Sequence, residues 1–287
     1  MSGAPFRARP FGRFELRHFG ELDSTNRYLL DEARAGAPAG VVVVADHQTA
    51  GRGRLGRSWE APAGANLLLS VLLRPALDPS DRHLATTAVA LAAVDAVAAL
   101  GLAAATGGRS DTGGDAPDRP PVTVGVKWPN DLVDGGGRKL AGVLAESDLS
   151  PVGPGGSLPA PVVVGIGVNV NWPADDGDLP TELRGRAVSL RMLAGAPVDR
   201  EALLGALLTA LEARAGDLDS PAGRVRLTDD LLHHCTTVGT RVRVDLADGS
   251  FEGTATGIDP GGHLLVEADG GIRTVVAGDV VHVRTGA

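Results

Sequence analysis

The sequence is poor in cysteine and has no long apolar run. Cys235 is the only cysteine among 287 residues, which excludes an intrachain disulfide and a cysteine-rich metal site. Disulfides belong to oxidising compartments, so this composition fits a reducing one. No stretch reaches the roughly 18 uncharged apolar residues of a membrane-spanning helix, and the start, MSGAPFRARPFGRFELRHF, lacks the apolar core of a signal peptide. We predict a soluble cytoplasmic protein with no membrane partner.

Positive charge is also scarce. The chain has 27 Lys and Arg against 35 Asp and Glu, a net charge of -8. Because binding to phosphates along a nucleic acid or membrane needs a basic face, this balance argues against both partners. Only two of the basic residues are lysines, Lys127 and Lys139. An ammonium is a compact point charge, unlike the broad guanidinium, so these two lysines are candidates for chemistry; retention by chance at a solvated strand end is the alternative.

Apolar periodicity divides the chain into an α/β body, residues 1–236, and a small β-rich end, residues 237–287. In the body it predicts helices near 24–35, 80–101, 199–215 and 221–234, and strands near 41–47, 66–74, 122–128, 138–148 and 161–171. Residues 103–121, rich in Gly, Pro and Asp, are expected to form a disordered insertion. From Val238, short alternating segments separated by ADGS, DPGG and DGG predict an antiparallel barrel or sandwich that folds separately.

One concentrated positive segment follows the apolar run VVVVADHQTA. This segment, GRGRLGRSWE at residues 51–60, sets three arginines among three glycines and ends beside Trp59. A glycine-rich backbone can wrap an anion, arginines neutralise phosphates and an indole offers a flat face to a base. The segment therefore predicts a nucleotide site, although its spacing is not that of a Walker loop. A solvated arginine–glycine loop is the alternative.

Two further motifs lie in the predicted strands. In VGVKWPNDL, Pro129 favours an extended Trp128 and Asn130-Asp131 favours a turn, which leaves Lys127 at a strand end where it can point into a cleft. In GIGVNVN, Gly165 and Gly167 indicate that something approaches the backbone closely, and Asn169 is polar in an apolar setting. By itself the second motif is weak, because glycine in a strand more often accommodates packing than contacts a ligand.

Together these motifs resemble those of the biotin protein ligases. The segments DSTN, HQTAGRGRLGRSW, GANLLLSVLLRP, VKWPNDL, RKLAGVLAE and VVVGIGVNVN carry the likeness, in this order. The resemblance implies an α/β (α+β) catalytic domain related to class II aminoacyl-tRNA synthetases and lipoate ligases, followed by an SH3-like β-barrel. Some family members carry an N-terminal DNA-binding domain. Only 22 residues precede Asp23 here, so the resemblance is to the monofunctional enzymes, with no nucleic-acid partner.

The resemblance also implies roles for single residues. Lys127, Arg52 and Arg54 are the expected catalytic residues, with Lys127 at the biotin carboxylate and the ATP phosphate. Leu55 stands where relatives carry a third basic residue. The expected biotin site comprises Ser24, Thr25, Asn26, Gln48, Arg52, Gly53, Arg54 and Lys127, and the expected ATP or adenylate site comprises Arg54, Arg57, Trp59, Lys127, Asn130 and Asn169.

The implied reaction activates biotin with ATP as biotinyl-5'-AMP, releases pyrophosphate and transfers biotin to a lysine of a biotin carboxyl carrier domain. Fixed cations are needed because two anions must approach each other, and Mg²⁺ is expected on the polyphosphate. A lipoate ligase or octanoyl transferase of the same fold is the nearest alternative, followed by a biotin-responsive regulator without catalytic activity. Cys235 lies outside every motif, which disfavours a cysteine-dependent acyl transfer. We expect a monomer or a weak homodimer.

Overall fold

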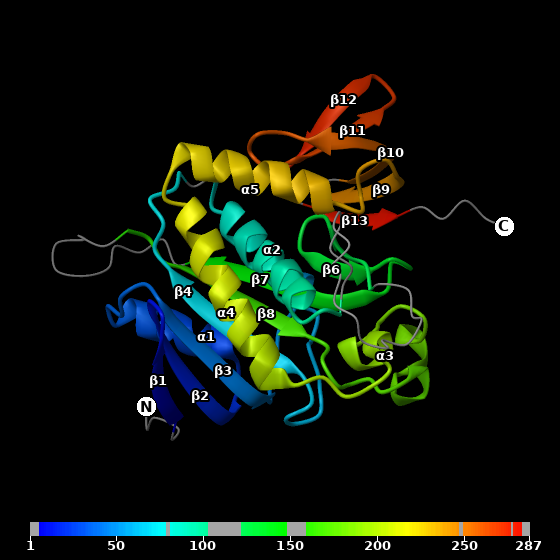
Figure 1. Ribbon diagram of the computed structural model, residues 1–287. Helices are drawn as coiled ribbons and strands as arrows, with labels where there is room; N and C mark the ends of the chain where they lie inside the picture. Colours follow the sequence, from blue (N-terminus) through cyan, green and yellow to red (C-terminus); the bar gives the residue numbers. More distant parts are fainter. Residues whose placement is uncertain are drawn as a thin grey trace, which may run out of the picture.

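The computed structural model describes residues 6–78, 81–102, 122–147, 159–246, 249–276 and 278–282. An eight-stranded sheet forms the body, with the strand order β1-β2-β3-β4-β8-β7-β6-β5 (Figure 1). All neighbours are antiparallel except β2 and β3. Its strands are β1 (Phe6–Phe11), β2 (Phe14–Leu22), β3 (Val41–Gln48), β4 (Leu67–Leu73), β5 (Val124–Lys127), β6 (Asp131–Asp134), β7 (Lys139–Ser147) and β8 (Val162–Val168).

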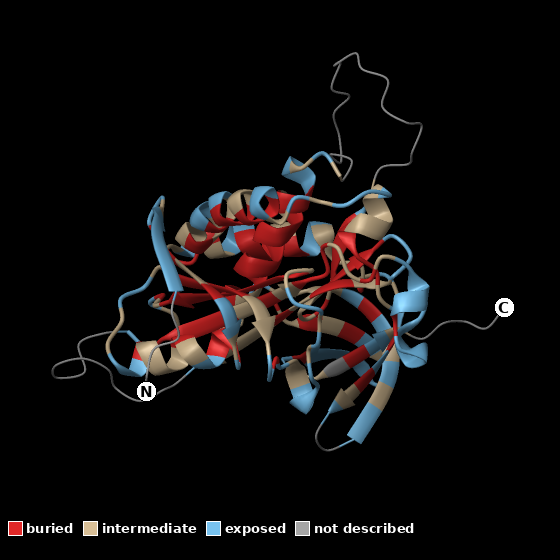
Figure 2. Cartoon of the chain, turned by 90° about the horizontal axis from the view of Figure 1, so that it is seen from below, coloured by how far each residue is buried: buried red, intermediate tan, exposed pale blue. Residues whose placement is uncertain are grey.

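Helices cover both faces of this sheet because its central strands are apolar on both sides. In the run VVVV, Val42 and Val44 join the core under helices α2 (Leu84–Ala99), α4 (Arg200–Asp217) and α5 (Pro221–His234). Val41 and Val43 pack instead with helix α1 (Thr25–Arg34). Alternate side chains of a strand point to opposite faces, so α1 lies across the sheet from the other three helices. Figure 2 shows the buried residues gathered in the sheet and the helices packed on it.

Helix α1 begins where a polar side chain can cap it. Ser24 has extended backbone angles, and its Oγ accepts a hydrogen bond from the backbone N–H of Arg27 at 3.5 Å. This contact selects Ser24 over Asp23 as the capping residue. The helix start thereby holds Ser24, Thr25 and Asn26 at the end of β3, and all three are buried.

The C-terminal domain is a five-stranded antiparallel sheet with its own apolar core. Its order is β12-β11-β10-β9-β13, built from β9 (Arg241–Leu246), β10 (Gly249–Ile258), β11 (Leu264–Ala268), β12 (Gly271–Val275) and β13 (Asp279–His282). Trp128 of the larger domain is part of this core: it is 4 % exposed, and its indole N–H donates to the carbonyl of Gly262 at 3.0 Å. Residues 237–287 alone lack this side chain, and separate folding of the domain stays a prediction.

The predicted α/β body with a C-terminal β domain is confirmed, and most of its elements lie where periodicity placed them. The structure adds strands β1, β2 and β6 and the short helix α3 (Leu190–Ala194), none of which the sequence pattern had indicated. The predicted insertion at 103–121 lies outside the described residues. In the described ranges, none of the helices is both long and apolar enough to span a membrane.

Candidate active site

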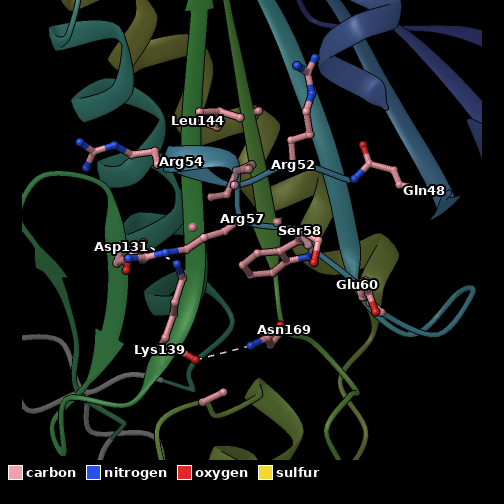
Figure 3. Close-up of a pocket in the computed structure, with 18 of the residues that line it drawn as sticks. Gln48, Arg52, Arg54, Arg57, Ser58, Glu60, Asp131, Lys139, Leu144 and Asn169 are labelled. Carbon is pink, nitrogen blue, oxygen red and sulfur yellow. Dashed lines mark hydrogen bonds and ion pairs between the residues drawn. The ribbon is translucent and has the colours of Figure 1, made fainter. Parts of the chain in front are cut away.

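A cavity of about 1080 Å³ opens beside the sheet, under the segment predicted to bind a nucleotide (Figure 3). Its walls come from the start of α1, the end of β3, residues 49–62 and residues 178–187, and strands β7 and β8 form its floor. Of the predicted site residues, it brings together Ser24, Thr25, Asn26, Gln48, Arg52, Gly53, Arg54, Arg57, Trp59, Asn130 and Asn169.

Three glycines lie at two neighbouring pairs of positions on β7 and β8, in the floor of the cavity. Gly142 pairs with Gly167, and Leu144 with Gly165. A Cβ atom on Gly167 would lie 2.6 Å from the Trp59 indole, and one on Gly165 would lie 2.3 Å from Asn26 Oδ1. The predicted close approach to both glycines is confirmed, and the groups that approach are side chains of the protein itself.

One end of the cavity is a buried hydrogen-bonded network. Gln48 Oε1 accepts from the backbone N–H of Thr25 at 2.7 Å and from its hydroxyl at 3.0 Å. Ser70 Oγ lies 2.7 Å from Thr25 Oγ1 and 2.6 Å from Asn26 Oδ1. These contacts fix the orientation of the side chains, so this end presents a rigid polar surface to a neutral polar ligand group.

Glu146 connects this network to the arginine-rich segment. Its Oε2 accepts from Asn26 Nδ2 at 2.8 Å, and its Oε1 lies 3.4 Å from the Arg52 guanidinium. Asn26 Nδ2 also donates to the Leu144 carbonyl at 3.1 Å. Both amide hydrogens of Asn26 are therefore used within the protein, and Glu146 holds Arg52 at the edge of the polar end.

The other end of the cavity is cationic and aromatic. The ammonium of Lys139 lies 2.7 Å from Asp131 Oδ1 and 5.7 Å from the centre of the Trp59 ring, a cation–π distance. Figure 3 shows Lys139 and Arg57 both directed towards Asp131. Asn169 lies beneath them, buried, and its Nδ2 donates to the Val188 carbonyl at 3.1 Å. This end can bind an anion next to a flat ring.

Arg54 reaches away from this cluster to the C-terminal domain. Its guanidinium donates to Asn130 Oδ1 at 2.9 Å and to the Gly278 carbonyl at 3.0 Å. The Asn130 amide is held in turn by a bond from its Nδ2 to the Val143 carbonyl at 2.8 Å. Arg54 and Asn130 also border a second cavity of about 310 Å³, which lies between the larger domain and Gly262 and Val276 of the smaller one.

Lys127 is the predicted catalytic residue that the structure does not bring to the cavity. It ends β5, which is the edge strand, and β6 lies between β5 and β7. It is absent from the lining of both described cavities. Burial and the positive charge of Lys127 lower the pKa of His282, which places this lysine beside the C-terminal domain. Lys127 nevertheless pairs across the β5–β6 hairpin with Asp131, which lines the cavity, so its assignment to the reacting groups stays a prediction.

Lys139, the second lysine of the chain, does line the cavity, at its cationic end. The sequence marks Lys139 as a candidate because it is one of only two lysines. Its partner Asp131 is not marked in the same way, because the sequence favours only a turn at this residue. Glu146 and Ser70 gave no signal either, because a single carboxylate or hydroxyl in an apolar strand has no characteristic spacing. Their role depends on strand pairing that only the structure supplies.

Comparison with known proteins finds matches for both the larger domain and the C-terminal domain. A model of the biotin/lipoate A/B protein ligase family matches residues 19–169, and a model of the biotin protein ligase C-terminal domain matches residues 237–283. Among curated proteins, the chain is 39 % identical over 267 residues to a biotin–[acetyl-CoA-carboxylase] ligase of Mycobacterium tuberculosis, covering 92 % of this chain and 87 % of that protein. A ligase of the same description from Paracoccus denitrificans is 33 % identical over 90 % of this chain and 96 % of its own length.

A solved structure shares the whole arrangement. The biotin protein ligase from Aquifex aeolicus in complex with biotin and ATP aligns with a TM-score of 0.71 and 26 % identity. The alignment covers 94 % of this chain and 99 % of that one. The likeness therefore extends across both domains.

Proposed function

We propose that this chain, which belongs to the biotin/lipoate A/B protein ligase family, carries out its biotin–[acetyl-CoA-carboxylase] ligase activity in the cavity beneath residues 51–60. The observation that supports this site is the union, in one cavity, of a rigid polar end around Thr25 and Gln48 with a cationic, aromatic end around Lys139 and Trp59. Biotin has a polar ring and an anionic tail, and ATP has a flat base and an anionic chain. The two ends match these groups.

The polar end is suited to the ureido ring of biotin. Ser24, Thr25 and Gln48 line it and are already oriented by the protein. Gln48 Oε1 is occupied by Thr25, so the amide nitrogen of Gln48 and the hydroxyl of Ser24 are the groups offered to the ligand. A site that hydrogen-bonds a polar ring discriminates strongly against an analogue without those groups, by about 10⁴–10⁵. This favours biotin over a lipoyl or octanoyl chain.

Lys139 takes the role of the cation where the two substrates meet. In the first step a carboxylate oxygen of biotin forms a bond to the α-phosphorus of ATP, and the bond to the bridging oxygen breaks, releasing pyrophosphate. Both reactants are anionic, so a compact ammonium beside them stabilises the transition state. Arg57 and Arg52 add charge along the phosphates, and Trp59 and Asn169 border the space for the adenine. No nucleophilic side chain is required.

Mg²⁺ fits this site as a companion of ATP. The described residues contain no group of three or more His, Cys, Asp or Glu that could hold a metal ion. Mg²⁺ is commonly bound by one or two carboxylates together with substrate phosphates and water, so a preformed cage is not needed. Asp131, paired with Lys139 at 2.7 Å, is the carboxylate we propose for it. The ion would neutralise charge on the leaving pyrophosphate.

In the second step the amine of an acceptor lysine attacks the acyl carbon of the adenylate, and AMP leaves. The acceptor we propose is the biotin carboxyl carrier domain of a biotin-dependent carboxylase. The amine must lose a proton for this attack, and AMP departs as an anion that Lys139 and Arg57 can stabilise. Walls on both sides of the cavity would keep water from the mixed anhydride until the acceptor arrives.

Pyrophosphate release tests this assignment. The protein mixed with biotin and ATP, without acceptor, is expected to release pyrophosphate, and lipoate or octanoate in place of biotin is expected to release almost none. Adding a carrier domain should then yield a biotinylated lysine. Release that is equal with lipoate, or that does not depend on any acid, would overturn the assignment of biotin to the polar end.

A further inference from the structure

Two exposed leucines stand at the mouth of the cavity. Leu55 is 70 % exposed and Leu183 is 42 % exposed, and both belong to the cavity lining. They come from segments far apart in the chain, and each lies on a single turn of 3-10 helix, Arg54–Gly56 and Thr181–Leu183. Single exposed apolar residues are ordinary. These two, however, lie on the rim of the same cavity.

Leu55 is also held in a conformation that a leucine rarely adopts. Its φ of 57° and ψ of 34° are left-handed, and within the described ranges it is the sole non-glycine residue with a positive φ. Such a conformation is strained for a bulky residue. In the free protein the side chain recovers little of this cost through burial. A surface that covers Leu55 would recover it.

The reaction requires such a surface. A lysine side chain carries its amine on a stem of only four carbons, so the acceptor protein must touch the rim of the cavity for its amine to reach the adenylate inside. By the proposed function the substrates contact Thr25, Gln48 and Lys139, which are buried or half-buried, whereas both leucines are exposed. The leucines therefore face the position that the acceptor must occupy during transfer.

We propose that Leu55 and Leu183 are apolar contacts for the acceptor carrier domain, one on each of two rim segments. This inference rests on the proposed transfer step. Covering them removes apolar surface from water without placing a charge against a charge, so the contact helps to bind the domain. Both leucines should influence the Michaelis constant for the acceptor and leave adenylate formation unchanged.

The test separates the two half-reactions in Leu55→Ala, Leu183→Ala and the double variant. We expect biotin-dependent pyrophosphate release at the wild-type rate, and a fall of about tenfold in kcat/KM for the carrier domain in each single variant, carried by KM and larger in the double variant. Transfer from the adenylate to hydroxylamine, a small nucleophile that needs no docking surface, should be unchanged. Leu232→Ala, at a leucine 43 % exposed and outside the cavity lining, is the matched control.

Leu55→Gly adds a check on the backbone. Glycine adopts positive φ without strain, so this variant keeps the loop conformation and loses only the side chain. It should show the same rise in KM as Leu55→Ala.

An unchanged KM for the carrier domain in the double variant would overturn the proposal. So would a parallel rise in hydroxylamine capture and in release of adenylate, since the leucines would then be closing over the ligand. Failure of the wild type to release pyrophosphate would instead count against the proposed function.

Discussion

At the scale of single residues, the reacting end of the cavity is organised by the pair of Lys139 and Asp131. The carboxylate holds the ammonium at 2.7 Å, beside the Trp59 ring, and so fixes a charge that a long flexible side chain would otherwise spread over many positions. A preorganised cation stabilises a transition state more than a mobile one because less reorganisation is needed during reaction. We therefore propose that Asp131, besides its proposed part in binding Mg²⁺, positions Lys139.

Replacing the two lysines one at a time tests this arrangement. We expect Lys139→Ala to lower the rate of biotin-dependent pyrophosphate release by about 10²–10³, the usual loss when one preorganised charge-stabilising group is removed. Lys127→Ala should stay close to the wild-type rate, because Lys127 lies outside the cavity lining. Comparable losses in both variants, measured with saturating biotin and ATP, would restore Lys127 to the site.

Gly165 provides a second test at this scale. In Gly165→Ala the new methyl group would meet Asn26 Oδ1 at 2.3 Å and Ser70 Oγ at 3.1 Å, so the polar end must shift. We expect biotin affinity to fall by about five- to 150-fold, the equivalent of 1–3 kcal/mol for a disturbed buried hydrogen bond. Calorimetry should show ATP affinity nearly unchanged. Gly205→Ala, on an open helix position, is the control.

At the scale of elements, the position of β6 decides which lysine lines the cavity. β5 and β6 form a hairpin, so β6 separates Lys127 from β7, whereas Lys139 begins β7 itself.

Sequence periodicity predicted the long helices and most of the buried strands because their apolar pattern repeats over many residues. It missed β6 and α3, which are four and five residues long, and β1, whose side chains are nearly all exposed. The glycine-rich loop was predictable from composition, but its partners Glu146 and Asn130 depend on strand pairing.

The charge of Lys127 near His282 gives a pH-dependent prediction. Burial, followed by the charge of Lys127, lowers the pKa of His282 below its ordinary 6.5. The unfolded chain therefore binds more protons than the folded one below pH 6.5, and the free energy of unfolding should fall as the pH drops through 6.5 to the folded pKa. In Lys127→Met the pKa of His282 should rise towards 6.5 and the fall should be smaller. Histidine NMR titration checks this, and an unmoved His282 pKa would contradict it.

At the scale of the whole molecule, Trp128 joins the two domains. Its side chain is part of the C-terminal core, and its backbone N–H donates to Thr237 Oγ1 at 3.0 Å. We expect Trp128→Ala to lower the free energy of unfolding by about 3–5 kcal/mol, the usual cost of emptying a buried tryptophan site. Trp128→Phe keeps most of the packing and should lose about 1 kcal/mol with the bond to Gly262.

Denaturant unfolding followed by near-UV circular dichroism measures both changes. If the C-terminal sheet unfolds in a separate, earlier transition only in Trp128→Ala, the tryptophan is the main connection between the domains. A free energy of unfolding equal to that of the wild type in Trp128→Ala would show that the core of the C-terminal sheet does not depend on this side chain.

Arg54 links the arginine-rich segment at residues 51–60 to the C-terminal domain. The guanidinium that belongs to the substrate loop is shared between Asn130 of one domain and the Gly278 carbonyl of the other. A ligand that draws Arg54 towards phosphate would break its hydrogen bond to the Gly278 carbonyl. By thermodynamic reciprocity, a partner that strengthens the contact between Arg54 and Gly278 would weaken the binding of that ligand. Occupancy of the cavity and the position of the C-terminal domain would then be coupled through this one side chain.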